Sequence, residues 1–363
     1  MRTTFAPTSL EDSPEINRLL GELNLGELSD GAVTAFGGRN DNWAGITSTG
    51  SAVFVKRVRG ELAGDQIRRS VGFDAAVERS GRTELLSPRL LGHDEEARLM
   101  VTDLLREAPT AADLFADGRF DEELAHRAGR AVGLLHETDP ATLHTRLDTT
   151  RPWLPNPALN RAVPLRAFLH FTIAEITFWQ IVHADSALCA AIERLREREG
   201  AAEGCPVHCD VRLDQFLHHD GLLYLIDGEE FRLADPARDV GGFVGDCLHH
   251  ILRGLSGGPG ESGCADEPSH DALVERGTRD LARARPVLTA FWDGYRSARR
   301  TVDPELAVRA TAFAGWQLID RALAIAGMSS RLGAGARAAM GIGRTALLAP
   351  ERYAAALGLG RTS

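Results

Sequence analysis

The sequence predicts an α+β fold with two lobes, a β-rich N-terminal lobe and an α-rich C-terminal lobe. Three observations lead to this prediction. Alternating apolar residues mark strands within the first hundred or so residues, helical periodicity dominates from residue 121, and a hairpin that carries carboxylates interrupts the helices at 205–227. The chain of 363 residues is also long for one hydrophobic core. We expect 1–105 to form the first lobe and 106–363 the second.

The first lobe is expected to be mostly β with one or two helices. Residues 8–30 carry leucines and an isoleucine at helical spacing, which predicts a short amphipathic helix. A second helix is predicted at 65–79. The strands alternate apolar and polar side chains, and we place them at 32–36, 42–47, 52–58 and 98–105.

The second lobe is expected to be helical apart from the hairpin. The helical segments are predicted at 121–137, 163–199, 240–255, 268–300 and 304–328. Within the hairpin, Gly221 separates two apolar runs and makes the turn. This turn would bring Asp210 and Asp227 to the same end of a small sheet, which is more often a metal site than a structural accident.

The segment from His208 to Gln215 carries the most informative pattern in the chain. It reads H-C-D-x-x-x-x-Q and is followed by D-G-E, where protein kinases have H-R-D-x-x-x-x-N and D-F-G. Phosphoryl transfer needs a carboxylate that orients the attacking hydroxyl, and further oxygens that hold magnesium on the phosphates. We therefore predict that Asp210 orients the hydroxyl and that Gln215 and Asp227 bind magnesium. Glu229 is a candidate ligand of a second magnesium ion.

Lys56 ends an alternating strand and shares the side of that strand on which Phe54 lies. A lone lysine in a strand usually faces solvent, but the motifs downstream favour a lysine that binds the α- and β-phosphates of ATP. Such a lysine needs an acid on the following helix. Asp74 is the first candidate and Glu78 the second, and because they are four residues apart both could face the sheet.

The remaining candidate residues surround the expected nucleotide. Gly37, Gly38 and Asn40 lie in a turn whose backbone amides could cover the phosphates, although the turn lacks G-x-G-x-x-G and could be an ordinary hairpin. In a kinase-like lobe, the backbone from Asp103 to Leu105 would meet the adenine edge.

Two further residues are expected to support the catalytic loop from behind. Asp239 precedes a helix and is either its N-cap or an acid that braces the loop, and we favour the brace. His208, the first residue of the motif, is placed beside it in the same supporting role.

Composition and charge limit the possible partners. A formal net charge of −10 argues against nucleic-acid binding, which favours a basic surface. Five irregularly spaced cysteines are typical of reduced thiols, and they lack a second Cys/His pair for zinc. No apolar signal segment or membrane-length apolar run occurs in the sequence, so we expect a soluble cytoplasmic protein.

Taken together, these residues resemble the aminoglycoside phosphotransferase (APH)/choline kinase-like family over roughly residues 30–330. The matching segments are His208 to Gln215 (H-G-D-x-x-x-x-N), Ile226 to Glu229 (I-D-W-E), Ala234 to Val240 (G-D-P-A-W-D-L) and Gly133 to His136 (G-x-L-H). The resemblance implies a bilobal, protein-kinase-like fold and an O-phosphotransferase that uses ATP and magnesium.

A narrower resemblance concerns the segments from Arg39 to Trp43 and from Val53 to Lys56. They look like the kinase-like proteins of class V lanthipeptide and thioamitide biosynthesis. This resemblance implies phosphorylation of Ser or Thr in a ribosomally made precursor peptide, before a partner lyase eliminates the phosphate.

Three departures from the family pattern leave other functions open. Gln215 replaces Asn, Cys209 replaces Gly and Gly228 replaces Trp, all beside the expected metal. A catalytically weak pseudokinase that binds a peptide or a lyase is therefore one alternative. A small-molecule kinase of the aminoglycoside type is another, and it would need an acidic pocket, for which the candidates are Glu229, Glu230, Asp235 and Asp246.

Overall fold

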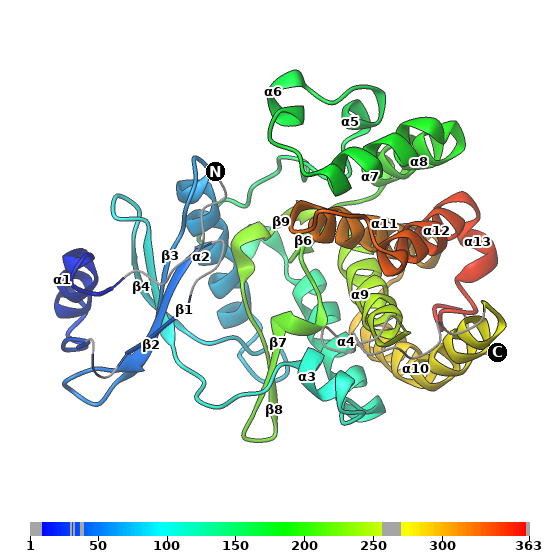
Figure 1. The fold of residues 1–363 in the computed structure, drawn as a ribbon. Helices are drawn as coiled ribbons and strands as arrows, with labels where there is room; N and C mark the ends of the chain where they lie inside the picture. The colour runs from blue at the N-terminus through cyan, green and yellow to red at the C-terminus, as the bar shows by residue number, and fades with distance from the viewer. Residues whose placement is uncertain (1–8, 30, 32, 37–39, 256–269, 361–363) are drawn as a thin grey trace.

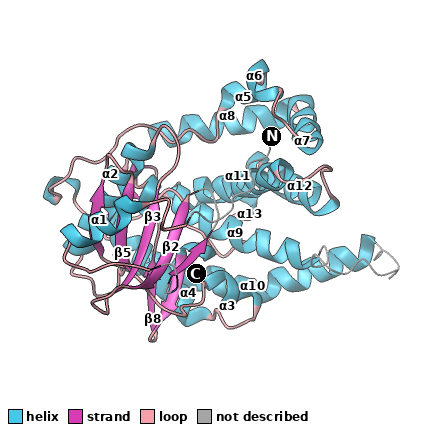
Figure 2. Cartoon of the chain, turned by 60° about the vertical axis from the view of Figure 1, so that its left-hand side comes forward, coloured by secondary structure: helices cyan, strands magenta, loops and turns pink. Residues whose placement is uncertain are grey.

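The computed structural model describes residues 9–29, 31, 33–36, 40–255 and 270–360. These residues form an α+β fold in which a β-sheet occupies the N-terminal region and helices make up most of the rest (Figure 1). In a second view, the strands gather on one side of the molecule and the long helices on the other (Figure 2). The expected arrangement of a β-rich and an α-rich region is therefore confirmed.

The N-terminal region contains one antiparallel sheet of five strands and two helices. The sheet order is β1-β2-β3-β5-β4. The elements are α1 (Pro14–Glu22), β1 (Val33–Phe36), β2 (Asp41–Ile46), β3 (Ala52–Arg57), α2 (Ala63–Arg79), β4 (Leu90–Asp94) and β5 (Leu99–Asp103). Strand β4 was not predicted, because its sequence, Leu-Leu-Gly-His-Asp, does not alternate apolar and polar residues.

Strand β3 shows the alternation that its sequence predicts. Val53 and Val55 are fully buried and pack with Trp43 of β2 against the leucines of α1. Phe54 and Lys56 therefore lie on the opposite face of the sheet, which is turned toward the helical region. The alternation thus fixes which face of the sheet carries the lysine.

The helical region begins after residue 103 and includes four helices that the sequence did not predict, α3, α5, α12 and α13. Its helices are α3 (Ala111–Ala116), α4 (Glu122–Glu137), α5 (Pro157–Arg161), α6 (Leu165–Phe168), α7 (Ile173–Ala184), α8 (Ser186–Ala201), α9 (Ala237–Leu255), α10 (His270–Ala298), α11 (Leu306–Gly327), α12 (Ala334–Leu348) and α13 (Pro350–Tyr353). None of the described helices is long and apolar enough to cross a membrane.

Two glycines allow α4 and α10 to pack closely. A Cβ atom on Gly129 would lie 1.9 Å from the carbonyl oxygen of Phe291, and one on Gly294 would lie 2.0 Å from that of His126. Because neither helix carries a side chain at its crossing point, the backbones approach each other directly. This contact stabilises the helical layer behind the site.

Two small β-pairs stand between the sheet and the helices (Figure 1). Strand β6 (Cys205–Val207) pairs with β9 (Arg232–Ala234), and β7 (Phe216–His219) forms a hairpin with β8 (Leu222–Leu225). Asp220 and Gly221 adopt φ angles of 49° and 73° at the hairpin turn. The predicted hairpin is confirmed. The candidate site residues lie at its open end, opposite the turn.

Candidate active site

The register of the β7–β8 hairpin brings Gln215 next to Asp227. Phe216 pairs with Leu225, and the amide of Ile226 donates a hydrogen bond of 2.9 Å to the carbonyl oxygen of Gln215. The Gln215 side chain is buried and its Nε2 donates to Asp214 at 3.2 Å. Its Oε1 is buried without a hydrogen-bond partner among the described residues. A buried acceptor beside a carboxylate is what a cation ligand requires.

Magnesium fits this pair of residues. The ion commonly takes one or two protein ligands and completes its shell with waters and substrate phosphates. Gln215 Oε1 and the Asp227 carboxylate supply hard oxygen donors of that kind. In the described part of the chain, no group of three or more His, Cys, Asp or Glu side chains could hold a metal by itself. The residues thus suit a metal that arrives with a nucleotide better than a permanently bound ion.

Lys56 is held by two carboxylates from the helical region. Its Nζ lies 2.5 Å from Asp227 Oδ1 and 2.8 Å from Glu229 Oε2. Burial alone would raise the pKa of Asp227, but the charge and hydrogen bond of Lys56, together with the charges of His208 and Arg212, lower that pKa. Asn40 donates to Glu229 at 3.2 Å and accepts from the amide of Arg59 at 3.1 Å. Asn40, Lys56 and Glu229 therefore link the sheet to the segment after the hairpin.

The expected ion pair between Lys56 and Asp74 is wrong. Asp74 instead lies 2.5 Å from Arg82 and accepts a hydrogen bond from the amide of Leu90 at 3.3 Å. The second candidate on α2, Glu78, is exposed.

Phe73 is the residue of α2 that faces the catalytic loop. Its ring packs edge-on against that of His208 at 5.3 Å. A Cβ atom on Gly228 would lie 2.5 Å from Phe73. The glycine that replaces the family's tryptophan thus gives space to a phenylalanine from α2, and the rotation of α2 that seats this ring directs Asp74 toward Arg82.

The loop that carries Asp210 is anchored by Asp239. This carboxylate is fully buried and accepts hydrogen bonds of 2.8 Å from the amides of both His208 and Cys209. It also lies 3.0 Å from His136 Nε2, whose other ring nitrogen lies 3.1 Å from the hydroxyl of Tyr295. A buried carboxylate with several hydrogen-bond partners holds a loop in one conformation.

Two residues of the site have left-handed backbone conformations. Cys209 has a φ angle of 67° and Asp227 one of 66°. Glycine adopts this region most readily, so Cys209 stands where the family's glycine avoids strain. His208 Nε2 lies 2.9 Å from the carbonyl oxygen of Ile226, which joins the two strained segments. The loop and the hairpin are therefore fixed relative to each other.

Asp210 has an unusual protonation equilibrium. Burial by the surrounding protein raises its pKa to about 7, against the opposing effect of Arg212. Arg212 Nη1 lies 2.7 Å from Asp210, and Arg212 Nε lies 2.9 Å from Asp214. Arg212 was not predicted as a site residue, although its position two residues after Asp210 in the same loop was the available signal. The carboxylate and guanidinium could together receive an alcohol and a phosphoryl group.

The structure describes some of the residues that were expected around adenine and the phosphates. Gly37 and Gly38 lie outside the described residues. Asp103 ends β5 and pairs with Arg89 at 3.0 Å, and Leu105 follows it, half-buried, on the segment that leads to α3.

The expected acidic pocket is not formed by the carboxylates proposed for it. Asp235 is buried in a two-point ion pair with Arg309, at 2.7 and 3.0 Å. Asp246 is buried and accepts a hydrogen bond from the amide of Leu213 at 3.0 Å. Glu229 and Glu230 are paired with Lys56 and Arg232 respectively. These carboxylates hold the chain together, which argues against a site built from them for a polycationic substrate.

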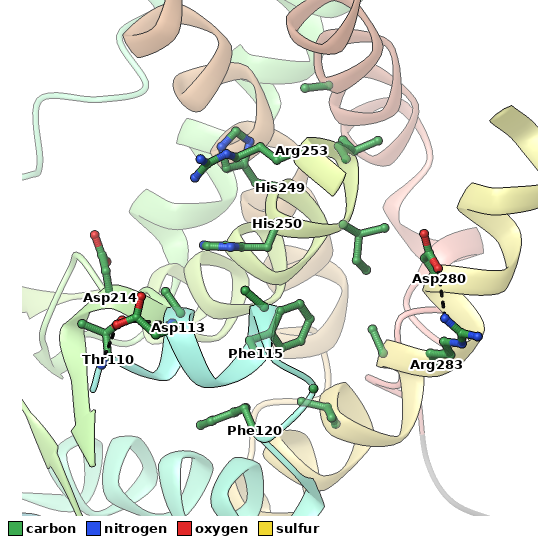
Figure 3. A pocket seen from close by; sticks show the side chains of 18 of the residues that line it. Thr110, Asp113, Phe115, Phe120, Asp214, His249, His250, Arg253, Asp280 and Arg283 are labelled. Atoms are coloured by element: carbon green, nitrogen blue, oxygen red, sulfur yellow. Dashed lines mark hydrogen bonds and ion pairs between the residues drawn. The ribbon is translucent and has the colours of Figure 1, made fainter. Parts of the chain in front are cut away.

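A cavity of about 1270 Å³ opens beside the catalytic loop (Figure 3). It lies between α3, α9, α10, α11 and α12, and Asp214 is part of its wall. Phe115 and Phe120 contribute apolar surface to one side of the cavity, and His249 and Arg253 lie on the side opposite to them (Figure 3). The cavity is large enough for a drug-sized molecule or a short peptide segment.

This arrangement of a sheet, a helical region and a carboxylate loop between them defines a kinase-like phosphotransferase fold. The chain belongs to the APH phosphotransferase enzyme family, whose model matches residues 33–262. No curated protein matches the sequence significantly.

Solved structures show the same fold at low sequence identity. An amicoumacin kinase in complex with AMP-PNP and Ca²⁺ is 13% identical, with a TM-score of 0.56 over 93% of this chain and 94% of that one. A glucosamine kinase is 20% identical, with a TM-score of 0.54 over 93% and 87%. A choline/ethanolamine kinase family protein from Mesorhizobium loti is 15% identical, with a TM-score of 0.53 over 90% and 92%.

Proposed function

We propose that this protein transfers the γ-phosphoryl group of ATP to an alcohol, with magnesium as its metal. The observation that carries this proposal is the ion pair of Lys56 with Asp227, together with the backbone hydrogen bond that places Gln215 beside Ile226, the residue before Asp227. The side-chain oxygen of Gln215 is buried and has no partner among the described residues. Asp210 orients the acceptor hydroxyl and takes its proton. Lys56 contacts the α- and β-phosphates once it is released from Asp227.

Magnesium would be held by Asp227 and Gln215, and it supplies positive charge to the phosphates of the nucleotide. Because the reaction depends mainly on positioning and charge, the anchored loop is the protein's principal contribution. Asp239 and His208 keep Asp210 and Asp227 at a fixed separation through the hydrogen bonds described above. Asn40 and Glu229 position Lys56 from the other side.

The acceptor in this proposal is a Ser or Thr of a ribosomally made precursor peptide, phosphorylated ahead of elimination by a partner lyase. The resemblance of the segments 39–43 and 53–56 to class V lanthipeptide and thioamitide kinases supports this choice. The cavity beside Asp214 is also large enough for a peptide segment. A small hydroxyl compound is the alternative acceptor, and the amicoumacin and glucosamine kinases of similar fold support it.

The test is to incubate the full chain with magnesium, ATP and a Ser/Thr-containing candidate precursor peptide, and to measure ADP release and peptide mass. We expect an increase of about 80 Da per phosphate, the mass of HPO₃, and ADP release that depends on the peptide. Glucosamine serves as the comparison acceptor. Phosphorylation of glucosamine but not of the peptide would favour the small-molecule reaction.

A catalytically weak pseudokinase is the second candidate, and Gln215 favours it. The longer amide changes the metal geometry in a site where magnesium demands near-octahedral coordination. Such a protein would bind the precursor peptide or the lyase without consuming ATP. Calorimetry that finds tight peptide binding and no binding of magnesium–ATP would support this function.

A further inference from the structure

A row of buried polar groups without partners lies at the contact of α9 and α11. His249 Nδ1, Gln317 Nε2 and Arg321 Nε are each buried and make no hydrogen bond within the described part of the chain. Arg321 Nε and Gln317 Nε2 can only donate hydrogen bonds. Because buried donors normally have partners, the two donors on α11 indicate a missing acceptor. The unpaired Nδ1 of His249 faces them from α9 and donates in one of the two neutral tautomers of the ring.

The row lies next to the catalytic loop. Helix α9 packs on this loop, since a Cβ atom on Gly242 would lie 2.7 Å from the carbonyl oxygen of Val211. One turn later, a Cβ atom on Gly245 would lie 2.6 Å from the Cβ of Gln317. Arg321, one turn beyond Gln317, is close enough to Asp210 to lower the pKa of that carboxyl against the effect of burial. The unpaired donors on α11 thus extend away from Asp210 along that helix.

His249 connects this row to the cavity. It lines the cavity wall and is 9% exposed, and Arg253 stands one turn further along the same helix (Figure 3). Burial, together with the charges of His250, Arg321 and Arg253, lowers the pKa of His249 to about 4. The imidazole is therefore neutral near pH 7, and the groups that surround it are predominantly cationic.

Most charged side chains near His249 already have partners within the protein. Among the basic groups, Arg321 lies 2.9 Å from Asp320, and His250 lies 3.8 Å from Asp246. Arg253 has no ion pair with any described residue. Four acids of the cavity wall are engaged: Asp214 pairs with Arg212 at 2.9 Å, Asp113 belongs to the capping box of α3, Asp121 caps α4, and Asp280 pairs with Arg283. The remaining acid of the wall, Glu122, is exposed on α4. An incoming anion would meet donors here rather than free carboxylates.

We propose that His249, Gln317 and Arg321 form a subsite for an anionic group of the acceptor, with Arg253 at its entrance. The subsite would take a carboxylate that lies close to the hydroxyl to be phosphorylated. For a peptide, this means a Ser or Thr beside an Asp or Glu; for a small molecule, it means a hydroxy acid rather than an amino sugar. This inference rests on the proposed phosphotransferase function and specifies its substrate class.

The test compares two peptides that differ in one charge, acetyl-Ala-Ser-Glu-Ala-amide and its Gln counterpart. Their dissociation constants are measured by calorimetry with the full chain in the presence of magnesium and AMP-PNP. We expect the Glu peptide to bind about tenfold more tightly, since charge-assisted hydrogen bonds are roughly twice as strong as neutral ones. Arg321→Gln should reduce this ratio to nearly one.

Two further variants show whether a loss of peptide discrimination reflects the subsite or misfolding of the protein. Arg253→Gln changes an exposed side chain at the entrance and should reduce the ratio by about threefold without affecting the fold. Arg283→Gln is the matched control, because Arg283 lines the same cavity but belongs to α10 and faces Asp280 (Figure 3). It should leave the ratio unchanged.

The outcomes separate the subsite from the function on which it rests. Equal binding of the two peptides, or no binding of the Glu peptide, would overturn the subsite. Weaker AMP-PNP binding by Arg321→Gln without peptide would also overturn it, because the donors would then hold a nucleotide phosphate. The phosphotransferase function fails by a different result, namely the absence of ATP-dependent transfer to every acceptor tried, with or without a carboxylate.

Discussion

The ammonium group of Lys56 lies 2.8 Å from the carboxylate of Glu229, an acid that follows the catalytic hairpin. The acid that holds this lysine therefore comes from the helical region and not from α2. Phe73 faces the loop from α2, and Gly228 provides the space for its ring. Gly228 directly precedes Glu229 and contacts Phe73, so the position of Glu229 is coupled to the packing of α2.

Glu229→Gln tests this relationship directly. The amide keeps the size of the side chain but removes its negative charge. That charge is expected to hold Lys56 once Asp227 binds magnesium. We expect about a tenfold loss in ATP affinity with an unchanged magnesium requirement, measured by nucleotide titration at several magnesium concentrations. Asp74→Asn is the control and should leave ATP affinity unaltered. If Asp74→Asn lowered ATP affinity and Glu229→Gln did not, the acid that positions Lys56 would belong to α2.

The pH dependence of the reaction should follow Asp210. Only the deprotonated carboxylate can accept the hydroxyl proton, and burial raises its pKa to about 7. Activity expressed as kcat/KM should therefore fall about tenfold per pH unit below pH 7 and level off above it. Arg212 opposes the effect of burial, so Arg212→Gln should move the midpoint to higher pH. A midpoint near pH 4 in the unmodified protein would show that Asp210 is not the group whose titration controls kcat/KM.

Gln215→Asn should restore the shorter ligand of the family. Both side chains offer the same amide oxygen, but the extra methylene of Gln215 makes it fold back or bind through a water. We expect the unmodified protein to need a high magnesium concentration, and Gln215→Asn to lower that requirement and raise turnover. A magnesium titration of ADP release decides the matter. If neither quantity changes, Gln215 is not a ligand.

Gly228→Ala should destabilise the fold through its contact with α2. The added methyl group would lie 2.5 Å from Phe73, so the ring or the hairpin segment must move, at a cost of about 1–3 kcal/mol. Thermal unfolding of the full chain measures the change. Gly341→Ala in α12 is the control, because a Cβ there meets no atom within 4 Å. An equal effect of the two substitutions would show that Phe73 does not fill the space at Gly228.

The sequence predicted the features that depend on local pattern. The alternation around Lys56 and the turn at Gly221 defined a strand face and a hairpin, and both are present in the structure. Asp74 was misplaced because a pair four residues apart indicates a helix face but not the rotation of that helix, which the packing of Phe73 decides. Helix α12 was missed because it contains several glycines, which disfavour a helix interior.

The unpaired donors of α9 and α11 could not be predicted from the sequence. His249 and Gln317 are far apart in the chain, and each looks like an ordinary helix residue. Only the close crossing of the two helices at Gly245 places them together. Whether a buried group lacks a partner depends on every neighbour in the fold, which a local pattern does not contain.

Transfer of phosphate with and without the Asp210 carboxylate is the most direct test of the central claim. The unmodified chain and Asp210→Asn are compared for AMP-PNP affinity and for peptide-dependent ADP release in magnesium. We expect equal nucleotide affinity and a loss of turnover of about 100-fold or more in the variant, the range for acid–base assistance. Equal turnover in the two proteins would contradict the assignment of Asp210 as the base.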